Sequence, residues 1–310
     1  MTANILFAAG AHRFATYEQP LRGALARAGV DSDLRTAFPP GQVDYIVYAP
    51  NSDLQDFTPY TRLKAVLNLW AGVEAVTANP TLKAPLARMV DHGLTRGMVE
   101  WVTGHVLRHH LGMDAHIHGL NGEWRKTLPP LAGDRGVSVL GLGELGRACA
   151  MTLAGLGFDV TGWSRTAKTI DAIRTSHGPD GLADALDRAE ILVLLLPDTP
   201  ATRNTLNAAT LARLPRGAVV INPGRGTLID DAALLGALDS GRIGHATLDV
   251  FRTEPLPPDH PYWSHPAVTV TPHIASETRP GTSSEVLAEN IRRGEAGEPF
   301  LHLVDRNQGY

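Results

Sequence analysis

Short apolar runs recur along the chain, separated by stretches in which apolar residues repeat with helical spacing. The runs lie at residues 4–9, 44–49, 64–70, 137–140, 159–163, 191–197, 218–222, 245–250 and 268–272. Such alternation is typical of α/β proteins with parallel sheets. Because the later runs are largely continuous, they predict strands that are buried on both faces.

The longest helical candidate covers residues 98–118. It has the repeat of an amphipathic helix, with apolar side chains at Met98, Trp101, Val102, Val106 and Met113. A polar, proline-rich connection at 121–136 follows it, and a last helix is expected at 281–299.

The pattern resets before this helix, and a length of 310 residues favours two domains. We therefore predict two Rossmann-like or flavodoxin-like domains with parallel sheets and a cleft between them. One is expected to comprise 1–97 plus 275–310, and the other 98–274.

Composition narrows the class of protein. Charged residues make up 19% of the chain, the net charge is −4 and no basic run stands out, which argues against a nucleic-acid partner. The densest apolar run, at 191–197, is too short to cross a membrane. Cys149 is the single cysteine, so no intrachain disulfide can form. The N-terminal residues lack the pattern of a signal peptide, and we expect a cytoplasmic protein.

The stretch GLGELG at 141–146 fits G-x-G-x-x-G, between an apolar run and a helical segment. In that context Gly141 allows a tight turn, Gly143 lets the backbone approach a pyrophosphate, and Gly146 lets helix and strand pack closely. The helix N-terminus offers N–H groups to phosphates. We predict a dinucleotide site here rather than an ordinary turn.

The end of the next predicted strand indicates which dinucleotide binds. An NAD site usually has Asp or Glu there, on the ribose 2′-hydroxyl. Here Ser164 takes that position, followed by Arg165, Thr166 and, further on, Lys168. A guanidinium and a hydroxyl would accept a 2′-phosphate, so NADP(H) is favoured over NAD(H).

Three later strand ends carry Arg225, Glu254 and His273. Ligands of open α/β sheets sit outside the carboxyl ends of the strands, so these side chains are expected to converge. Each alone is typical of an ordinary surface position, but together, beside a dinucleotide loop, they indicate an active site.

The motifs GLGELG, WSRT, NPGRGTLID, LDVFRTEPLP and TPHIA together resemble those of the D-isomer-specific 2-hydroxyacid dehydrogenase family. The segments EWRKTLPP and VDRNQGY are similar to its glyoxylate/hydroxypyruvate reductase A branch. The match is dense in the second half, whereas the first part matches mainly at LNLWAGVEAV. The resemblance implies NADPH-dependent reduction of a small 2-oxo acid. It also implies that the first domain binds substrate and the second the dinucleotide, in a homodimer built on the helix starting near Met98.

Residue roles follow from the resemblance. Arg225 corresponds to the substrate-binding arginine, His273 to the acid/base histidine, and Glu254 to its supporting carboxylate. The substrate carboxylate is expected on backbone N–H groups of Ala71, Gly72 and Val73. Asp249 matches a position near the nicotinamide carboxamide. Besides the residues already named, the expected cofactor contacts are Glu144, Leu145, Leu196, Pro197, Thr202, Pro223, Gly224 and Ala275.

Some features leave alternatives open. Pro223 departs from the family pattern and removes a backbone N–H. Tyr48 and Trp70 are expected near the substrate, whereas Trp124 has no assigned role. His105 and His109 have the spacing of metal ligands, but no third ligand is recognisable, and we expect no metal. The alternatives to the reductase are a dehydrogenase for larger 2-oxo acids and a dinucleotide-sensing regulator.

Overall fold

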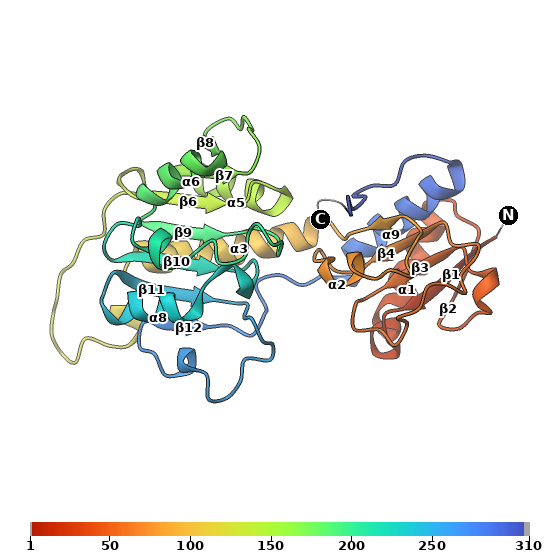
Figure 1. Cartoon of the computed structure of the whole chain (residues 1–310), viewed down its shortest axis with the longest axis horizontal. Coiled ribbons are helices and arrows are strands. Elements are labelled where there is room, and N and C mark those ends of the chain that lie inside the picture. The colour runs from red at the N-terminus through yellow and green to blue at the C-terminus, as the bar shows by residue number, and fades with distance from the viewer. Residues whose placement is uncertain (1, 307–310) are drawn as a thin grey trace. The chain divides into compact units, whose positions relative to one another are not determined.

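The computed structural model describes residues 2–306, so the end of the VDRNQGY segment lies outside the described residues. The chain divides into two compact units (Figure 1). We call residues 1–94 with 277–310 the N-terminal unit, and residues 95–276 the central unit.

The N-terminal unit is built on a five-stranded parallel sheet of order β2-β1-β3-β4-β5. The strands are β1 (Ala3–Ala8), β2 (Ser32–Arg35), β3 (Tyr45–Tyr48), β4 (Ala65–Asn68) and β5 (Leu86–Ala87). The apolar runs predicted β1, β3 and β4. The pattern missed β2 and β5, because β2 is a polar edge strand and β5 has two residues.

Two long helices, α1 (Ala11–Arg27) and α9 (Pro280–Ala296), pack together against this sheet. They bury Leu21 and Ile291 in one core with Ile5 of β1. A second core includes Val76 of the short helix α2 (Glu74–Thr77). Because α9 comes from the end of the chain, this unit is discontinuous in sequence.

The central unit has a seven-stranded parallel sheet of order β12-β11-β10-β9-β6-β7-β8. Its strands are β6 (Gly136–Leu140), β7 (Asp159–Ser164), β8 (Arg174–His177), β9 (Ile191–Leu194), β10 (Ala218–Asn222), β11 (Ile243–Leu248) and β12 (Val268–Val270). All except the polar edge strand β8 were predicted. The prediction of two α/β units with parallel sheets is thus confirmed.

Helices cover both faces of this sheet. One core joins α3 (His92–His110) and α5 (Glu144–Gly155), and the other joins α6 (Gly178–Asp187), α7 (Ala208–Leu211) and α8 (Asp231–Asp239). The short α4 (Asp114–Ile117) follows α3. Within residues 2–306, 3₁₀ turns lie at Pro40–Gln42, Ala132–Asp134, Gly226–Leu228 and Pro261–Trp263.

The helix predicted from Met98 begins earlier, at His92, and ends at His110. The carboxylate of Asp91 accepts the backbone N–H of Leu94 at 2.8 Å, which is the bond of an N-cap. Of the apolar positions in the predicted repeat, Met98 lies in the helix and is buried, whereas Met113 lies beyond the helix and is exposed. Among residues 2–306, no helix is long and apolar enough to cross a membrane.

Candidate active site

A histidine–carboxylate pair lies beyond the ends of two adjacent strands of the central unit. Nδ1 of His273, after β12, is 2.7 Å from Oε2 of Glu254, after β11. The other carboxylate oxygen, Oε1, accepts the backbone N–H of Phe251 at 2.8 Å. The ring is therefore oriented by a carboxylate that is itself held by the backbone.

The backbone around His273 is unusual, with a positive φ of 53°. Such a conformation costs on the order of 1–3 kcal/mol for a residue other than glycine, and the surroundings must enforce it. The buried Asp249 does so: its Oδ1 accepts the N–H of Ile274, its Oδ2 accepts that of Ala275, and its backbone oxygen accepts the N–H of His273, each at 2.9 Å. Thr271 Oγ1 adds a fourth bond to the same residue, at 2.5 Å.

This pairing raises the pKa of His273 and lowers that of Glu254, and both shifts favour the charged forms of an ion pair. The hydrogen bond to Glu254 raises the pKa of His273 above its ordinary value, although burial works against it. Burial raises the pKa of Glu254, but the bonds from His273 and Phe251 outweigh it, so the net pKa is lowered. The positive charge of Arg225 lowers both pKa values.

Arg225 lies in a turn whose two flanking glycines pack closely against the backbone of other segments. A Cβ at Gly226 would lie 2.0 Å from the carbonyl carbon of Phe251, and one at Gly224 would lie 2.8 Å from the oxygen of Leu194. The buried Asn222 folds the turn, because its side chain bonds the N–H of Gly224 and the carbonyl of Arg225. Both glycines therefore sit at a crowded strand end, where a side chain would not fit.

Asp230 then caps the next helix by accepting the N–H of Ala233 at 3.0 Å. Arg225 also donates from Nη1 to the carbonyl of Gly224 at 2.7 Å. Pro223 occupies a buried position between Asn222 and this turn. The sequence did not identify Asn222, whose role rests on two contacts within three residues of it.

The glycine loop has the predicted geometry. Gly141 has φ 106°, and a Cβ there would lie 2.3 Å from the carbonyl oxygen of Leu195, at the end of β9. A Cβ at Gly146 would lie 1.7 Å from the oxygen of Gly141, so α5 packs directly on the turn. Gly143 has open space above it, as the approach of a ligand requires. Glu144 and Leu145 open α5 directly after it.

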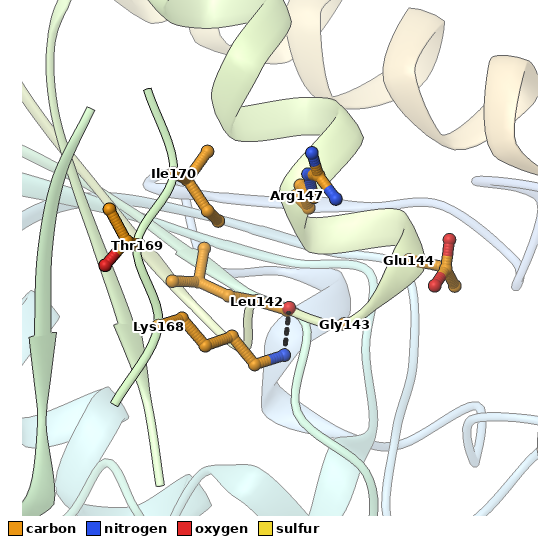
Figure 2. A pocket seen from close by; sticks show the side chains of 7 residues that line it. All are labelled: Leu142, Gly143, Glu144, Arg147, Lys168, Thr169 and Ile170. Carbon is orange, nitrogen blue, oxygen red and sulfur yellow. Dashed lines mark hydrogen bonds between the residues drawn. The ribbon is translucent and has the colours of Figure 1, made fainter. Parts of the chain in front are cut away.

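A cavity of about 260 Å³ adjoins this loop. It is lined by Leu142, Gly143, Glu144, Arg147, Lys168, Thr169 and Ile170 (Figure 2). Lys168 extends to the loop, where its Nζ donates to the carbonyl oxygen of Leu142 at 2.6 Å. Arg147, on the first turns of α5, adds a second cation that the sequence analysis did not single out.

The end of β7 presents no carboxylate in the segment 164–168. Ser164 is buried and its hydroxyl donates to the carbonyl oxygen of Thr166 at 2.8 Å. This bond shapes the turn and leaves Arg165 and Thr166 exposed. The hydroxyl of Ser164 is therefore already bonded within its own loop.

The loop after β9 also closes on itself. Thr202 Oγ1 donates to the carbonyl of Pro197 at 2.6 Å and accepts the N–H of Thr199 at 2.9 Å. Leu196 is buried beside it. The hydroxyl of Thr202 thus fixes the shape of the loop that borders the glycine turn.

The loop that is expected to bind the substrate carboxylate, at residues 71–73, lies in the N-terminal unit after β4. The side-chain amide of Asn68 donates to the carbonyl oxygens of Trp70 and Gly72, at 2.8 and 3.0 Å. Asn68 thereby holds the carbonyl groups of the residues on either side of Ala71. Val73, the next residue of the loop, leads into α2. Asn68 was not identified from the sequence, because it sits inside an apolar run.

Several further residues have roles that the structure defines. Tyr48 is a buried core residue, and its hydroxyl donates to the carbonyl of Leu54 at 3.1 Å, so it fills the N-terminal unit instead of lining an open site. Trp124 is 96% exposed. The ring of His105 packs against that of Trp101 in a tilted arrangement, and Nε2 of His109 bonds Thr247 at 2.9 Å. No cluster of three metal-ligating side chains occurs in the described part of the chain.

A parallel α/β unit with a glycine loop at its first strand–helix turn, and a carboxylate-paired histidine past the end of another strand of the same sheet, defines a dinucleotide-dependent oxidoreductase. Residues 104–275 match the family model described as D-isomer specific 2-hydroxyacid dehydrogenase, NAD binding domain. The chain belongs to the D-isomer specific 2-hydroxyacid dehydrogenase family.

Relatives support its reductase A branch. Glyoxylate/hydroxypyruvate reductase A of Photorhabdus laumondii is 40% identical over 86% of this chain and 88% of its own, and that of Serratia proteamaculans is 41% identical over 80% and 82%. A Xanthobacter autotrophicus family member, solved with NADPH and MES, is 39% identical with a TM-score of 0.91. The NADPH-dependent glyoxylate/hydroxypyruvate reductase of Sinorhizobium meliloti, solved with NADP and sulfate, is 36% identical with a TM-score of 0.85. Both structures match over the full length of each chain.

Proposed function

We propose that this protein reduces a small 2-oxo acid, glyoxylate or hydroxypyruvate, to the corresponding 2-hydroxy acid with NADPH, and that the product of hydroxypyruvate is the D isomer. The observation that carries the proposal is the 2.7 Å contact between His273 and Glu254 at the strand ends of the dinucleotide domain. The names of the reductase relatives support the substrate class. A regulator without turnover would not need a histidine held in a positive-φ conformation and paired with a carboxylate.

In this proposal His273 is the general acid. Its Nδ1 is bonded to Glu254, so Nε2 is the nitrogen that delivers a proton to the carbonyl oxygen as C2 is reduced. The hydrogen bond to Glu254 raises the pKa of His273, which increases the protonated fraction of the ring at a given pH. General acid help of this kind is worth roughly 10²–10⁴ in rate. The bound nicotinamide supplies the hydride.

Arg225 is proposed to hold the substrate. Its planar guanidinium can donate two parallel N–H groups to carboxylate and carbonyl oxygens. The backbone N–H groups of Ala71, Gly72 and Val73 are proposed as the second set of donors to the carboxylate. The carbonyl groups of Trp70 and Gly72 in the same loop accept hydrogen bonds from the Asn68 side chain. These bonds fix the loop before substrate arrives.

The dinucleotide fits the glycine loop, because Gly143 is open to solvent and the adjacent cavity is bordered by Arg147 and Lys168. We propose that Arg165 and Thr166 hold the 2′-phosphate of NADPH. The remaining loop residues, Leu196, Pro197, Thr202, Pro223, Gly224, Asp249 and Ala275, are proposed to border the cofactor. Asp249 and Ala275 bond to each other, and Asp249 also holds the backbone of His273. These two residues are therefore proposed to position the segment that carries His273.

The test is NADPH oxidation with glyoxylate, hydroxypyruvate, pyruvate and phenylpyruvate, repeated with NADH. We expect turnover of the first two acids with NADPH. Preference for phenylpyruvate would instead identify a dehydrogenase for larger acids, and tight NADPH binding without turnover would identify a sensing regulator. Arg165→Ala should weaken the binding of NADPH far more than that of NADH. An equal loss of affinity for both cofactors would refute the contact between Arg165 and the 2′-phosphate.

We further propose a cytoplasmic homodimer. The segment after α3 exposes large apolar side chains, namely Leu111, Met113, Ile117, Trp124, Leu128 and Leu131, which a second copy would cover. Sedimentation should show a dimer for the native chain and a monomer for Ile117→Asp with Leu128→Asp. The matched control is Met151→Asp, another exposed apolar side chain, in α5. A native monomer at micromolar concentration would refute the dimer.

A further inference from the structure

The N-terminal unit carries its own arginine at the carboxyl edge of its sheet. The strand order changes direction between β1 and β3, and ligands of open α/β sheets bind beyond the strand ends at such a point. Arg13 follows β1 and Asn51 follows β3. Nη1 of Arg13 donates to Oδ1 of Asn51 at 3.2 Å, so the two side chains bridge this point.

The guanidinium is fixed by further contacts. It lies 5.8 Å from the ring centroid of Trp70, which follows β4, the next strand of the sheet. Nη1 also donates to the carbonyl oxygen of Ala9 at 3.2 Å. Trp70 adjoins Ala71 in the chain, so Arg13 stands beside the loop proposed to bind the substrate carboxylate.

The partners of Arg13 leave its charge uncompensated. Within residues 2–306, Arg13 forms no ion pair, whereas Arg22 and Arg27 of the same helix pair with Glu18 and Glu285. An arginine held by an amide oxygen, a carbonyl and an aromatic ring keeps its full charge for an outside oxygen. Its preorganised fork loses little entropy when that oxygen binds.

We propose that Arg13 recognises an oxygen substituent on C3 of the substrate. The preferred class is then 2-oxo acids with a hydroxyl or a carboxylate on C3, and Arg13 is a specificity residue that donates N–H to that oxygen. The inference rests on the proposed function, because it presumes that the loop after Trp70 holds the 2-oxo acid. Glyoxylate, which has no C3, cannot use this contact.

The test compares Arg13→Met with the native chain on glyoxylate, pyruvate and hydroxypyruvate, with NADPH. We expect the kcat/KM ratio of hydroxypyruvate to glyoxylate to fall at least tenfold, mainly through the KM of hydroxypyruvate. Pyruvate, with a methyl at C3, should follow glyoxylate within about threefold. Arg27→Met, on the exposed part of the same helix, is the matched control and should leave all ratios unchanged.

Ratios measured on one preparation do not depend on the fraction of folded enzyme, so partial unfolding of the variant cannot hide the result. An unchanged ratio in Arg13→Met would overturn the inference. If the native chain reduces glyoxylate but the ratio stays constant, only the role of Arg13 fails. If the native chain reduces none of these acids with NADPH, the proposed function itself fails.

Discussion

Glu254 holds His273 through Oε2 and Nδ1, 2.7 Å apart, while its other oxygen is anchored on the backbone N–H of Phe251. The carboxylate therefore cannot turn away from the ring without breaking a second bond. This arrangement fixes which ring nitrogen faces outward, and it raises the pKa of His273.

Replacing Glu254 by Gln should move the pH dependence of turnover. Reduction needs protonated His273, so kcat/KM should be constant at low pH and fall as pH rises through the raised pKa. Without the carboxylate this pKa drops, and the fall should occur at lower pH. A tenfold weaker affinity of the ring for its proton corresponds to about 1.4 kcal/mol, and it slows reduction by a factor that approaches ten as pH rises well above the native pKa.

The measurement is kcat/KM for reduction across pH 5–9, a range chosen to bracket the ordinary histidine pKa of about 6.5. Oxidation of the 2-hydroxy acid should show the opposite trend, rising with pH through the same pKa. Glu285→Gln, which removes an exposed carboxylate on α9, is the control. Identical profiles for Glu254→Gln and the native chain would exclude Glu254 from setting the acidity of His273.

Arg225→Lys should impair catalysis without loss of cofactor affinity. Lysine keeps the charge but cannot form the two parallel bonds of a guanidinium. A charge-assisted hydrogen bond contributes about 1.5–3 kcal/mol, so kcat/KM should fall by roughly 10- to 100-fold. The dissociation constant of NADPH, measured by fluorescence titration, should stay unchanged. Arg216→Lys, at an exposed position, is the control, and near-native kinetics of Arg225→Lys would argue against bidentate contact.

Local patterns in the sequence were sufficient for the elements that are apolar or marked by glycine. The runs that became β6, β9 and β10 could be recognised because a strand buried on both faces needs apolar residues at nearly every position. The glycine loop was equally clear, since Gly146 and Gly141 touch within one turn.

Features that depend on distant partners could not be predicted. Asp249 bonds amides 25 and 26 residues away, and no spacing rule connects them. The polar edge strand β8 is defined by pairing with β7, not by its own residues. The start of α3 at His92 depends on Asp91 as a cap, and the apolar repeat that marks the helix is set by later positions.

Gly146→Ala should destabilise the central unit, although alanine usually favours a helix more than glycine does. Its Cβ would lie 1.7 Å from the carbonyl oxygen of Gly141, so the helix or the turn must shift. Overpacking of this kind costs about 1–3 kcal/mol, and the free energy of unfolding in urea should fall by that amount. NADPH affinity should fall with it, because the displaced turn is the one proposed to carry the phosphates.

The matched control is Gly236→Ala in α8, where an added Cβ meets nothing within 4 Å. There alanine should stabilise the fold by about 0.5–1 kcal/mol, because it lowers the entropy of the unfolded chain. Opposite signs for the two substitutions are the expected result. A neutral or stabilising Gly146→Ala would show that the turn is not packed as described.

His109 and His245 should make the fold less stable in acid. Their rings lie 4.9 Å apart, and their Nε2 atoms bond Thr247 and Thr269, each at 2.9 Å. Burial, together with nearby positive charge, lowers the pKa of His109 to about 3 and that of His245 to about 4. In the unfolded chain both would titrate near a pKa of about 6.5.

Between those values the unfolded chain binds more protons than the folded one, so stability is complete above about pH 6.5 and declines as pH falls. The loss from pH 7.5 to pH 5 should be on the order of 1–2 kcal/mol for each histidine. Urea unfolding at both pH values tests this, with His109→Gln/His245→Gln beside the native chain. The variant should lose less stability on acidification, because glutamine does not titrate; equal losses in the two proteins would show that the folded histidines titrate normally.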